Sequence, residues 1–156
     1  MTDPDDPRDL ILSLTLAAPR TKVWRCLTEP DLLRQWFAPA PWRVGPLSVD
    51  VRPGGRFDMT MHGPDGESFA SRGVYLEAVA PSRLVFTDCF AEGWVPAETP
   101  FMTAIITLGE AGGGSTAYQA RVRHRTMEDR EKHAAMGFEP GWSQCARQLE
   151  ALAQTL

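Results

Sequence analysis

Residues 139–154 read EPGWSQCARQLEALAQ, and they form the one long amphipathic segment of the chain that could cover a sheet. Apolar side chains recur in it at i, i+3, i+7 and i+10, which places them on one face of an α-helix: Trp142, Cys145, Leu149 and Leu152. Much of the preceding chain has the pattern of β-strands, and the apolar face of a sheet must be covered by another element. The segment therefore predicts an α+β fold in which a sheet packs against this helix.

Residues 47–124 alternate between apolar and polar side chains, the period-two pattern of half-buried strands. Turns rich in Gly and Pro, such as Pro53-Gly54-Gly55 and Gly63-Pro64-Asp65-Gly66, divide this region. We expect six strands in it, at residues 47–51, 56–61, 68–79, 83–90, 102–108 and 116–124, with a longer loop at 91–100. Short turns between successive strands indicate an antiparallel sheet.

A further strand and three shorter helices complete the expected elements. Residues 9–16, DLILSLTL, alternate as a strand does, and the apolar spacing after Pro19 predicts two short helices at 19–28 and 30–36. A loop at 38–46 and a charged helix at 127–135 are also expected. We therefore predict a curved antiparallel sheet of six to seven strands that wraps around the C-terminal helix, with two short helices after the first strand.

The composition is that of one globular domain. The chain has 156 residues, of which 43% are hydrophobic and 23% charged, and we expect a disordered tail at 1–8 and a single domain at 9–156. A net charge of −4 argues against general binding to nucleic acid or to an anionic membrane surface. No apolar run approaches the roughly 18 residues of a membrane span. The acidic N-terminus is unlike a signal peptide, so a cytoplasmic location is expected.

Several short motifs, in this order, resemble a known family. They are Val23-Trp24-Arg25-Cys26-Leu27-Thr28-Glu29-Pro30, Leu33-x-x-Trp36-Phe37, Pro53-Gly54-Gly55-Arg56-Phe57, Gly73-Val74-Tyr75-Leu76-Glu77, Pro81-Ser82-Arg83-Leu84-Val85-Phe86-Thr87, Gly113-Gly114-Ser115-Thr116 and Gly141-Trp142-Ser143-Gln144. The chain resembles the START-like (SRPBCC) superfamily, which includes birch-pollen-allergen proteins and aromatic polyketide cyclases. Within it, the chain is most similar to the branch named after the activator of the Hsp90 ATPase. The resemblance implies the helix-grip fold over about residues 9–154, and no single motif implies one chemistry.

Strand parity predicts which side chains line an apolar cavity, because alternate residues of a strand point to opposite faces. From the strands we expect Met59, Met61, Val74, Leu76, Leu84, Phe86, Met102, Ala104, Ile106, Tyr118, Ala120 and Val122 to face inward. The C-terminal helix adds Trp142, Cys145 and Leu149. Such a wall suits a hydrophobic or planar ligand. The alternative is that these side chains fill a packed core.

Two polar residues share the inward parity. Asp88 follows Phe86, and His124 follows Val122, so both are candidates for a general base or for a group that orients a ligand. The alternative is that both lie in solvent, because each stands at the end of a strand.

The other histidines, the cysteines and the arginines have simpler interpretations. His62 is expected in an exposed turn, and His133 on a helix surface, paired with Asp129 at i,i+4. Cys26, Cys89 and Cys145 are expected to be small buried thiols, and no close metal-ligand spacing occurs, so neither a metal nor a cofactor is expected. The cluster Arg121, Arg123 and Arg125 is expected on a solvated sheet face, with an acidic partner or a phosphate as the alternative.

Three classes of function follow. The first is a cofactor-free binding module for a small hydrophobic or aromatic molecule. The second is an enzyme of the cyclase or hydrolase type that uses Asp88 and His124, and it requires both residues to face one volume. The third is a protein-partner module, as the co-chaperone resemblance implies. Aromatic residues on or beside loops, Trp36, Phe37, Trp42 and Trp94, would form either the cavity mouth or the interface of a homodimer.

Overall fold

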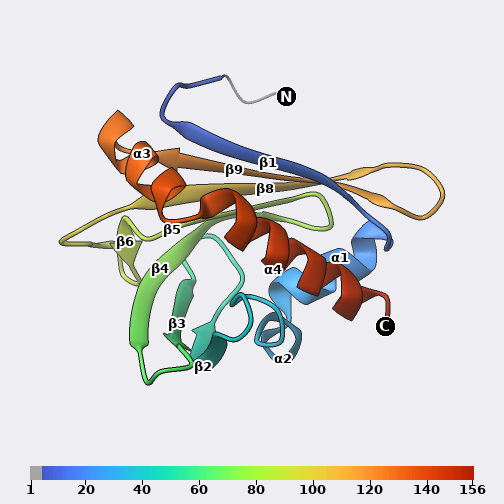
Figure 1. Ribbon diagram of the computed structural model, residues 1–156, viewed down its shortest axis with the longest axis horizontal. Coiled ribbons are helices and arrows are strands. Elements are labelled where there is room, and N and C mark those ends of the chain that lie inside the picture. The colour runs from blue at the N-terminus through green and yellow to red at the C-terminus, as the bar shows by residue number, and fades with distance from the viewer. Residues whose placement is uncertain (1–4) are drawn as a thin grey trace.

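The computed structural model describes residues 5–156 and has one large antiparallel sheet that curves around a long C-terminal helix (Figure 1). The strands of this sheet are β1 (Asp9–Leu16), β2 (Arg43–Val49), β3 (Arg56–His62), β4 (Ser68–Val79), β5 (Arg83–Thr87), β8 (Met102–Glu110) and β9 (Thr116–His124). The helices are α1 (Arg20–Thr28), α2 (Pro30–Leu33), α3 (Met127–Ala135) and α4 (Phe138–Ala153). The predicted α+β helix-grip architecture is confirmed.

The strand order is β1-β9-β8-β5-β4-β3-β2, so the first strand of the chain pairs with the last. Leu10 lies opposite Val122, and Leu12 lies opposite Ala120. These apolar pairs share one face because directly opposed residues in an antiparallel pair point the same way. In Figure 1, β1, β9 and β8 run across the view while β4 and β3 turn away from them, and α4 lies in the resulting concave face.

Helix α4 packs on the sheet through both small and large apolar side chains. Ala146, Leu149 and Ala153 are fully buried, and Trp142 and Cys145 are half-buried beside them. The two alanines let the helix backbone approach the sheet closely, while the larger side chains reach outward along the concave face. The predicted face of the helix is therefore the one that contacts the core.

Strand β4 departs from the predicted parity at a β-bulge. Tyr75 lies opposite Phe86 and Glu77 lies opposite Val85, so Leu76 is an extra residue without a partner. Tyr75 is fully buried and faces the core, where its ring stacks on Phe57. The predicted inward orientation of Val74 is therefore wrong: Val74 is buried on the opposite face, in register with Thr87.

The physical reason is that residues 74–76, Val-Tyr-Leu, are all apolar, so alternation could not reveal the register. Leu76, which was also expected to face inward, lies at the bulge and is only half-buried. Of the predicted inward residues, Leu84, Ala104, Ala120 and Val122 are buried in the core.

Two segments predicted as loops contain strands. Strand β2 begins at Arg43, within the predicted loop 38–46, and its register shifts between Val44 and Leu47, where Gly45 and Pro46 lie. In the predicted loop 91–100, β6 (Phe90–Ala91) pairs with β7 (Val95–Pro96). Helix α2 ends at Leu33, before the predicted boundary at 36.

The N-terminal segment pairs with the outer face of the sheet. Arg121 was expected in solvent but is 5% exposed, because Asp9 Oδ2 lies 3.0 Å from its Nη1. The predicted solvated face is therefore wrong at this residue, which an aspartate of β1 covers. Of the predicted disordered tail, residues 1–4 lie outside the described residues, and Asp6 forms an ion pair with Arg8 at 2.7 Å.

One glycine is required where β4 meets β5. A Cβ atom on Gly73 would lie 2.4 Å from the backbone oxygen of Thr87, so the strands would have to separate. We predict that Gly73→Ala lowers the free energy of unfolding by about 2–4 kcal/mol, as overpacking against a rigid backbone does. Urea unfolding followed by circular dichroism measures this loss. The matched control is Gly109→Ala in β8, whose Cβ would make an ordinary contact of 3.7 Å with Ala117; equal losses in both variants would contradict the prediction.

Candidate ligand-binding cavity

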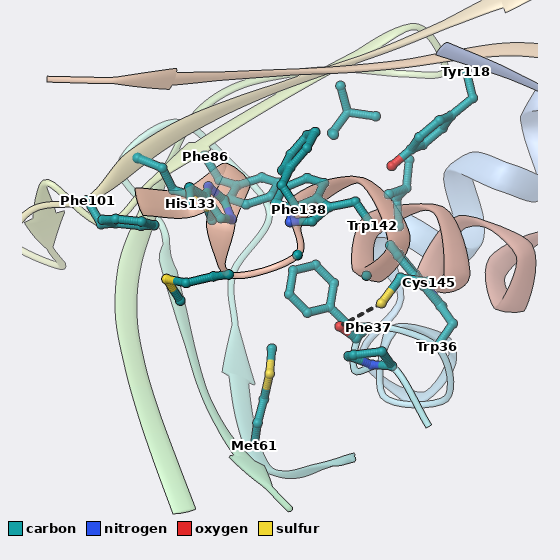
Figure 2. A pocket seen from close by; sticks show the side chains of 17 residues that line it. Trp36, Phe37, Met61, Phe86, Phe101, Tyr118, His133, Phe138, Trp142 and Cys145 are labelled. Atoms are coloured by element: carbon teal, nitrogen blue, oxygen red, sulfur yellow. Dashed lines mark hydrogen bonds between the residues drawn. The ribbon is translucent and has the colours of Figure 1, made fainter. Parts of the chain in front are cut away.

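A cavity of about 330 Å³ lies where α4, the concave face of the sheet and the segment after α2 meet (Figure 2). Aromatic and sulfur-containing side chains form most of its wall. The aromatic residues are Trp36, Phe37, Phe86, Phe101, Tyr118, Phe138 and Trp142, and the sulfur-containing residues are Met61, Met102, Met136 and Cys145. Among residues 5–156, no Lys, Arg, Asp or Glu lines this cavity, so the described wall is mainly apolar.

The segment after α2 is held against α4 by hydrogen bonds from one glutamine. Gln148 Nε2 donates to the backbone oxygens of Trp36 and Ala38, both at 2.9 Å. The indole N–H of Trp36 donates to the backbone oxygen of Cys26 at 2.8 Å. These bonds keep Trp36 and Phe37 on the cavity wall, so the alternative in which both rings belong to an exposed patch is wrong for Trp36, which is 4% exposed.

A smaller cavity of about 140 Å³ adjoins the first. Met59, Gly73 and Asp88 line only the smaller one. Four side chains line both cavities and thus separate them: Phe37, Met61, Phe86 and Met102. Phe86 is fixed by an edge-to-face contact with Phe57, with ring centroids 4.8 Å apart, while the two methionines have flexible side chains.

Strand parity predicted part of this wall. Met61, Phe86, Met102, Ile106, Tyr118, Trp142 and Cys145 line the larger cavity. Ala104, Ala120 and Leu149 are buried but line neither cavity, because they lie in the packed part of the core beneath α4. Phe101, His133 and Phe138 were missed. Phe101 lies just before β8, outside the alternating pattern, and no local pattern indicates that α3 and the turn after it fold onto the sheet.

Two weakly polar groups belong to the cavity wall. The hydroxyl of Tyr118 and the thiol of Cys145 belong to side chains that line the cavity, and Cys145 Sγ lies 3.7 Å from the backbone oxygen of Phe37. Burial raises the pKa of Cys145 to about 11. Burial, together with the nearby Cys145, also raises the pKa of Tyr118 above its usual value. Both groups are therefore neutral at pH 7.

The third polar group is a pair of buried histidines. His133 Nδ1 lies 2.9 Å from His124 Nε2, and both side chains are buried. Both rings contact Phe101, and that of His133 also contacts Phe138 and Trp142. The predicted surface pairing of His133 is wrong, because the last turns of α3 fold against the end of β9. Burial, and to a lesser extent the charge of His124, lowers the pKa of His133 to about 4.

Asp88 has a structural contact at the edge of the sheet. Its Oδ1 accepts hydrogen bonds from the backbone N–H groups of Phe101 and Met102, at 2.9 and 3.0 Å. Asp88 lines the smaller cavity, whereas His124 lines neither and contacts the larger one only through His133. The two predicted polar candidates therefore do not face one volume.

Other kinds of site find little support in the described part of the chain. Within residues 5–156, no three His, Cys, Asp or Glu side chains are grouped so as to hold a metal ion. No helix in the same range is long and apolar enough to cross a membrane. His62 is half-buried at the end of β3, where its ring lies over Gly45. Cys26 is buried as predicted, and burial raises its pKa to about 11.

The lowered pKa of His133 gives a testable dependence of stability on pH. In the unfolded chain the imidazole titrates near 6.5, and in the folded chain near 4, so between these values the unfolded state binds more protons. We predict that the free energy of unfolding falls as the pH drops from 6.5 to 5, with a slope of up to about 1.4 kcal/mol per pH unit. Chemical denaturation across this range measures the slope.

The control is His133→Gln, which removes the titrating ring and keeps a polar group. Carboxylates with lowered pKa, such as Asp6 and Glu29, change protonation at lower pH and are common to both proteins. If the free energy of unfolding of His133→Gln has the same slope against pH as that of the natural chain, His133 does not cause the pH dependence.

Comparison with known proteins supports the family resemblance. A family model described as Activator of Hsp90 ATPase homolog 1-like protein matches residues 17–154. The crystal structure of protein NE0264 from Nitrosomonas europaea is 41% identical in sequence, with 97% of each chain covered and a TM-score of 0.93. Protein Ms6760 from Mycobacterium smegmatis is 28% identical, with 94% of this chain and 90% of its own covered and a TM-score of 0.79.

A search of curated proteins returns no match. The family model nevertheless spans nearly the whole domain, from the end of β1 to the end of α4. The chain therefore belongs to the family of Activator of Hsp90 ATPase homolog 1-like proteins.

Proposed function

We propose that this protein binds a small hydrophobic molecule, preferably one with an aromatic ring system, in the cavity between α4 and the sheet. The observation that carries the proposal is the wall itself, which includes seven aromatic and four sulfur-containing side chains and, among residues 5–156, no Lys, Arg, Asp or Glu. Its volume of about 330 Å³ is within the range of known small-molecule sites, roughly 300–1,000 Å³.

The energetics of packing support this proposal over a merely imperfect core. Apolar wall atoms that no other side chain packs against lack the dispersion contacts of a close-packed interior, and this lack costs free energy. A ligand that occupies the cavity would recover part of that free energy, because it restores dispersion contacts with the wall. In the described part of the chain, no Arg or Lys lines the wall, which disfavours a carboxylate or a phosphate as the main recognition group of the ligand.

The alternatives are less well supported by the geometry. An enzyme that uses Asp88 and His124 requires both to reach one substrate, yet Asp88 holds the start of β8 and His124 lies behind His133. A role in binding a chaperone is suggested by the family description alone. The cavity is a feature of this chain's own residues, and it favours ligand binding over both alternatives.

Gly141 offers a way to fill the cavity without disturbing its wall. It lies in α4 and lines the cavity, and an added Cβ would meet no atom within 4 Å. We predict that Gly141→Leu weakens binding of the uncharged fluorescent probe N-phenyl-1-naphthylamine about tenfold or more, which corresponds to about 1.4 kcal/mol. Fluorescence titration of the natural chain and the variant measures the change.

The matched control is Gly141→Ala, which adds one carbon atom to the same position. This variant should keep most of the affinity for the probe. Its free energy of unfolding should be about 0.5–1 kcal/mol higher than that of the natural chain, because Ala is a better helix former than Gly. Unchanged affinity in Gly141→Leu would place the probe outside this cavity. A natural chain that shows no saturable binding would count against the proposed function.

A further inference from the structure

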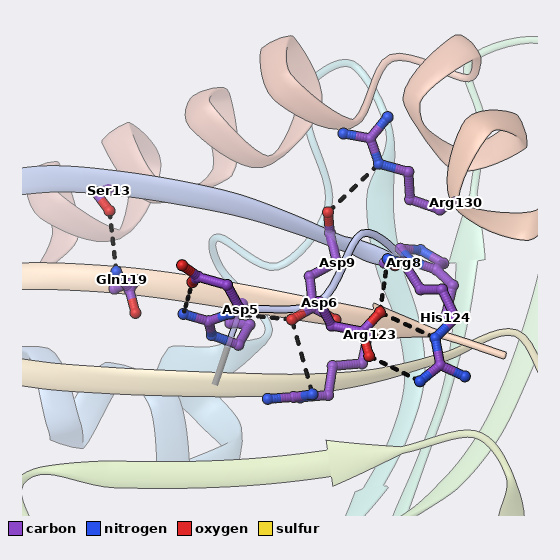
Figure 3. A network of polar contacts seen from close by, with 10 residues as sticks. Asp5, Asp6, Arg8, Asp9, Ser13, Gln119, Arg123, His124 and Arg130 are labelled. Atoms are coloured by element: carbon purple, nitrogen blue, oxygen red, sulfur yellow. Dashed lines mark hydrogen bonds and ion pairs between the residues drawn. The ribbon is translucent and has the colours of Figure 1, made fainter. Parts of the chain in front are cut away.

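A backbone carbonyl sets the direction of the hydrogen bonds in the histidine pair. His124 Nδ1 lies 2.9 Å from the backbone oxygen of Arg8, close to the start of β1 (Figure 3). A carbonyl oxygen can only accept a hydrogen bond, so His124 Nδ1 must carry the hydrogen. A neutral imidazole has one N–H group, so His124 Nε2 has a lone pair and acts as an acceptor.

The hydrogen bond between the two rings then fixes which nitrogen of His133 carries the hydrogen. His133 Nδ1 lies 2.9 Å from His124 Nε2 and must donate to it. His133 Nε2 then has no hydrogen and presents a lone pair. The carbonyl of Arg8 thus determines the tautomer of a histidine that is far from it in sequence, by way of one intervening ring.

This arrangement is the one that the pair has when both rings are neutral. His124 is 4% exposed, and its two hydrogen-bond partners are a carbonyl and another imidazole. His133 is enclosed by the rings of Phe101, Phe138 and Trp142, and its pKa is lowered to about 4. In the neutral pair, Nδ1 of each ring carries the hydrogen and Nε2 of each ring is an acceptor.

His133 Nε2 remains available to a ligand. Within residues 5–156 it has no hydrogen-bond partner, yet it is not among the fully enclosed polar atoms that lack one, which include Tyr75 Oη. Nε2 is therefore not fully enclosed by the protein, and His133 is part of the wall of the larger cavity.

We propose that His133 Nε2 is the hydrogen-bond acceptor of the cavity and that it selects an apolar ring compound with a hydroxyl or N–H donor, of which a phenol is the simplest example. This inference rests on the proposed ligand-binding function and names the chemistry that the ligand must have. Tyr118 does not impose such a selection, because a hydroxyl can both donate and accept. The donor requirement therefore comes from the histidine pair.

A matched pair of probes tests the selection. 2-Naphthol and 2-methoxynaphthalene have the same ring system, but only the first has a donor. We expect the natural chain to bind 2-naphthol about tenfold more tightly in calorimetric titration at pH 7, since a buried acceptor without a partner disfavours the ether. His133→Phe should bind both compounds with similar affinity, and Tyr118→Phe should keep the preference for 2-naphthol.

The outcomes separate this inference from the proposed function. Equal binding of both probes by the natural chain would overturn the role of His133. So would a preference for 2-naphthol that is lost in Tyr118→Phe and kept in His133→Phe. Either result would leave the cavity as a binding site. A natural chain that binds neither probe would count against the binding function, and with it against the selection.

A measurement without ligand tests the tautomer itself. Long-range proton–nitrogen correlation spectra of isotope-labelled protein distinguish a ring nitrogen that carries hydrogen from one that does not. We expect hydrogen on Nδ1 and none on Nε2 in both rings of the natural chain at pH 7. Hydrogen on Nε2 of His133 would overturn the inference, even if the substituted variants fail to fold.

Discussion

The fold depends on one geometric constraint: a single helix must cover the concave face of a seven-stranded sheet. Helix α4 has 16 residues and is therefore about 24 Å long, whereas β4 alone has 12 residues and extends roughly 40 Å. The helix is shorter than β4, and one helix about 10 Å across cannot cover seven strands that lie about 4.8 Å apart. The rest of the apolar surface is covered by the aromatic residues after α2 and by the end of α3, and these large, rigid rings leave space between them. The cavity is thus a consequence of the size of the sheet relative to its one long helix.

The sequence predicts the fold well because most of its elements are amphipathic. Alternation alone locates β1 and β9, and the charged run at 127–135 marks α3 at the bounds that the structure has. The failures occur where the pattern carries no information. Three apolar residues in succession conceal the bulge in β4, and Pro46 suggests a loop where β2 continues through an irregular register.

The candidate site is predicted less completely, because its residues come together through long-range packing. Parity identifies the parts of the wall that lie on regular strands, such as Met61, Phe86 and Met102. Parity cannot place Trp36 and Phe37, because their backbone oxygens accept hydrogen bonds from α4, more than 100 residues away: Gln148 donates to Trp36 and Cys145 to Phe37. His133 is missed for a related reason: a local pairing with Asp129 is plausible from spacing, while its real partner is at the end of a strand.

The hydrogen bond from His124 to the backbone of Arg8 has an evolutionary consequence. A main-chain carbonyl is present whatever amino acid occupies position 8, so substitutions there would leave the polarity of the two rings unchanged as long as β1 keeps its register. The apolar wall can vary residue by residue to admit molecules of other shapes. Descendants of this chain could thus diversify in the size of what they accommodate while inheriting one fixed polar contact from the path of the backbone.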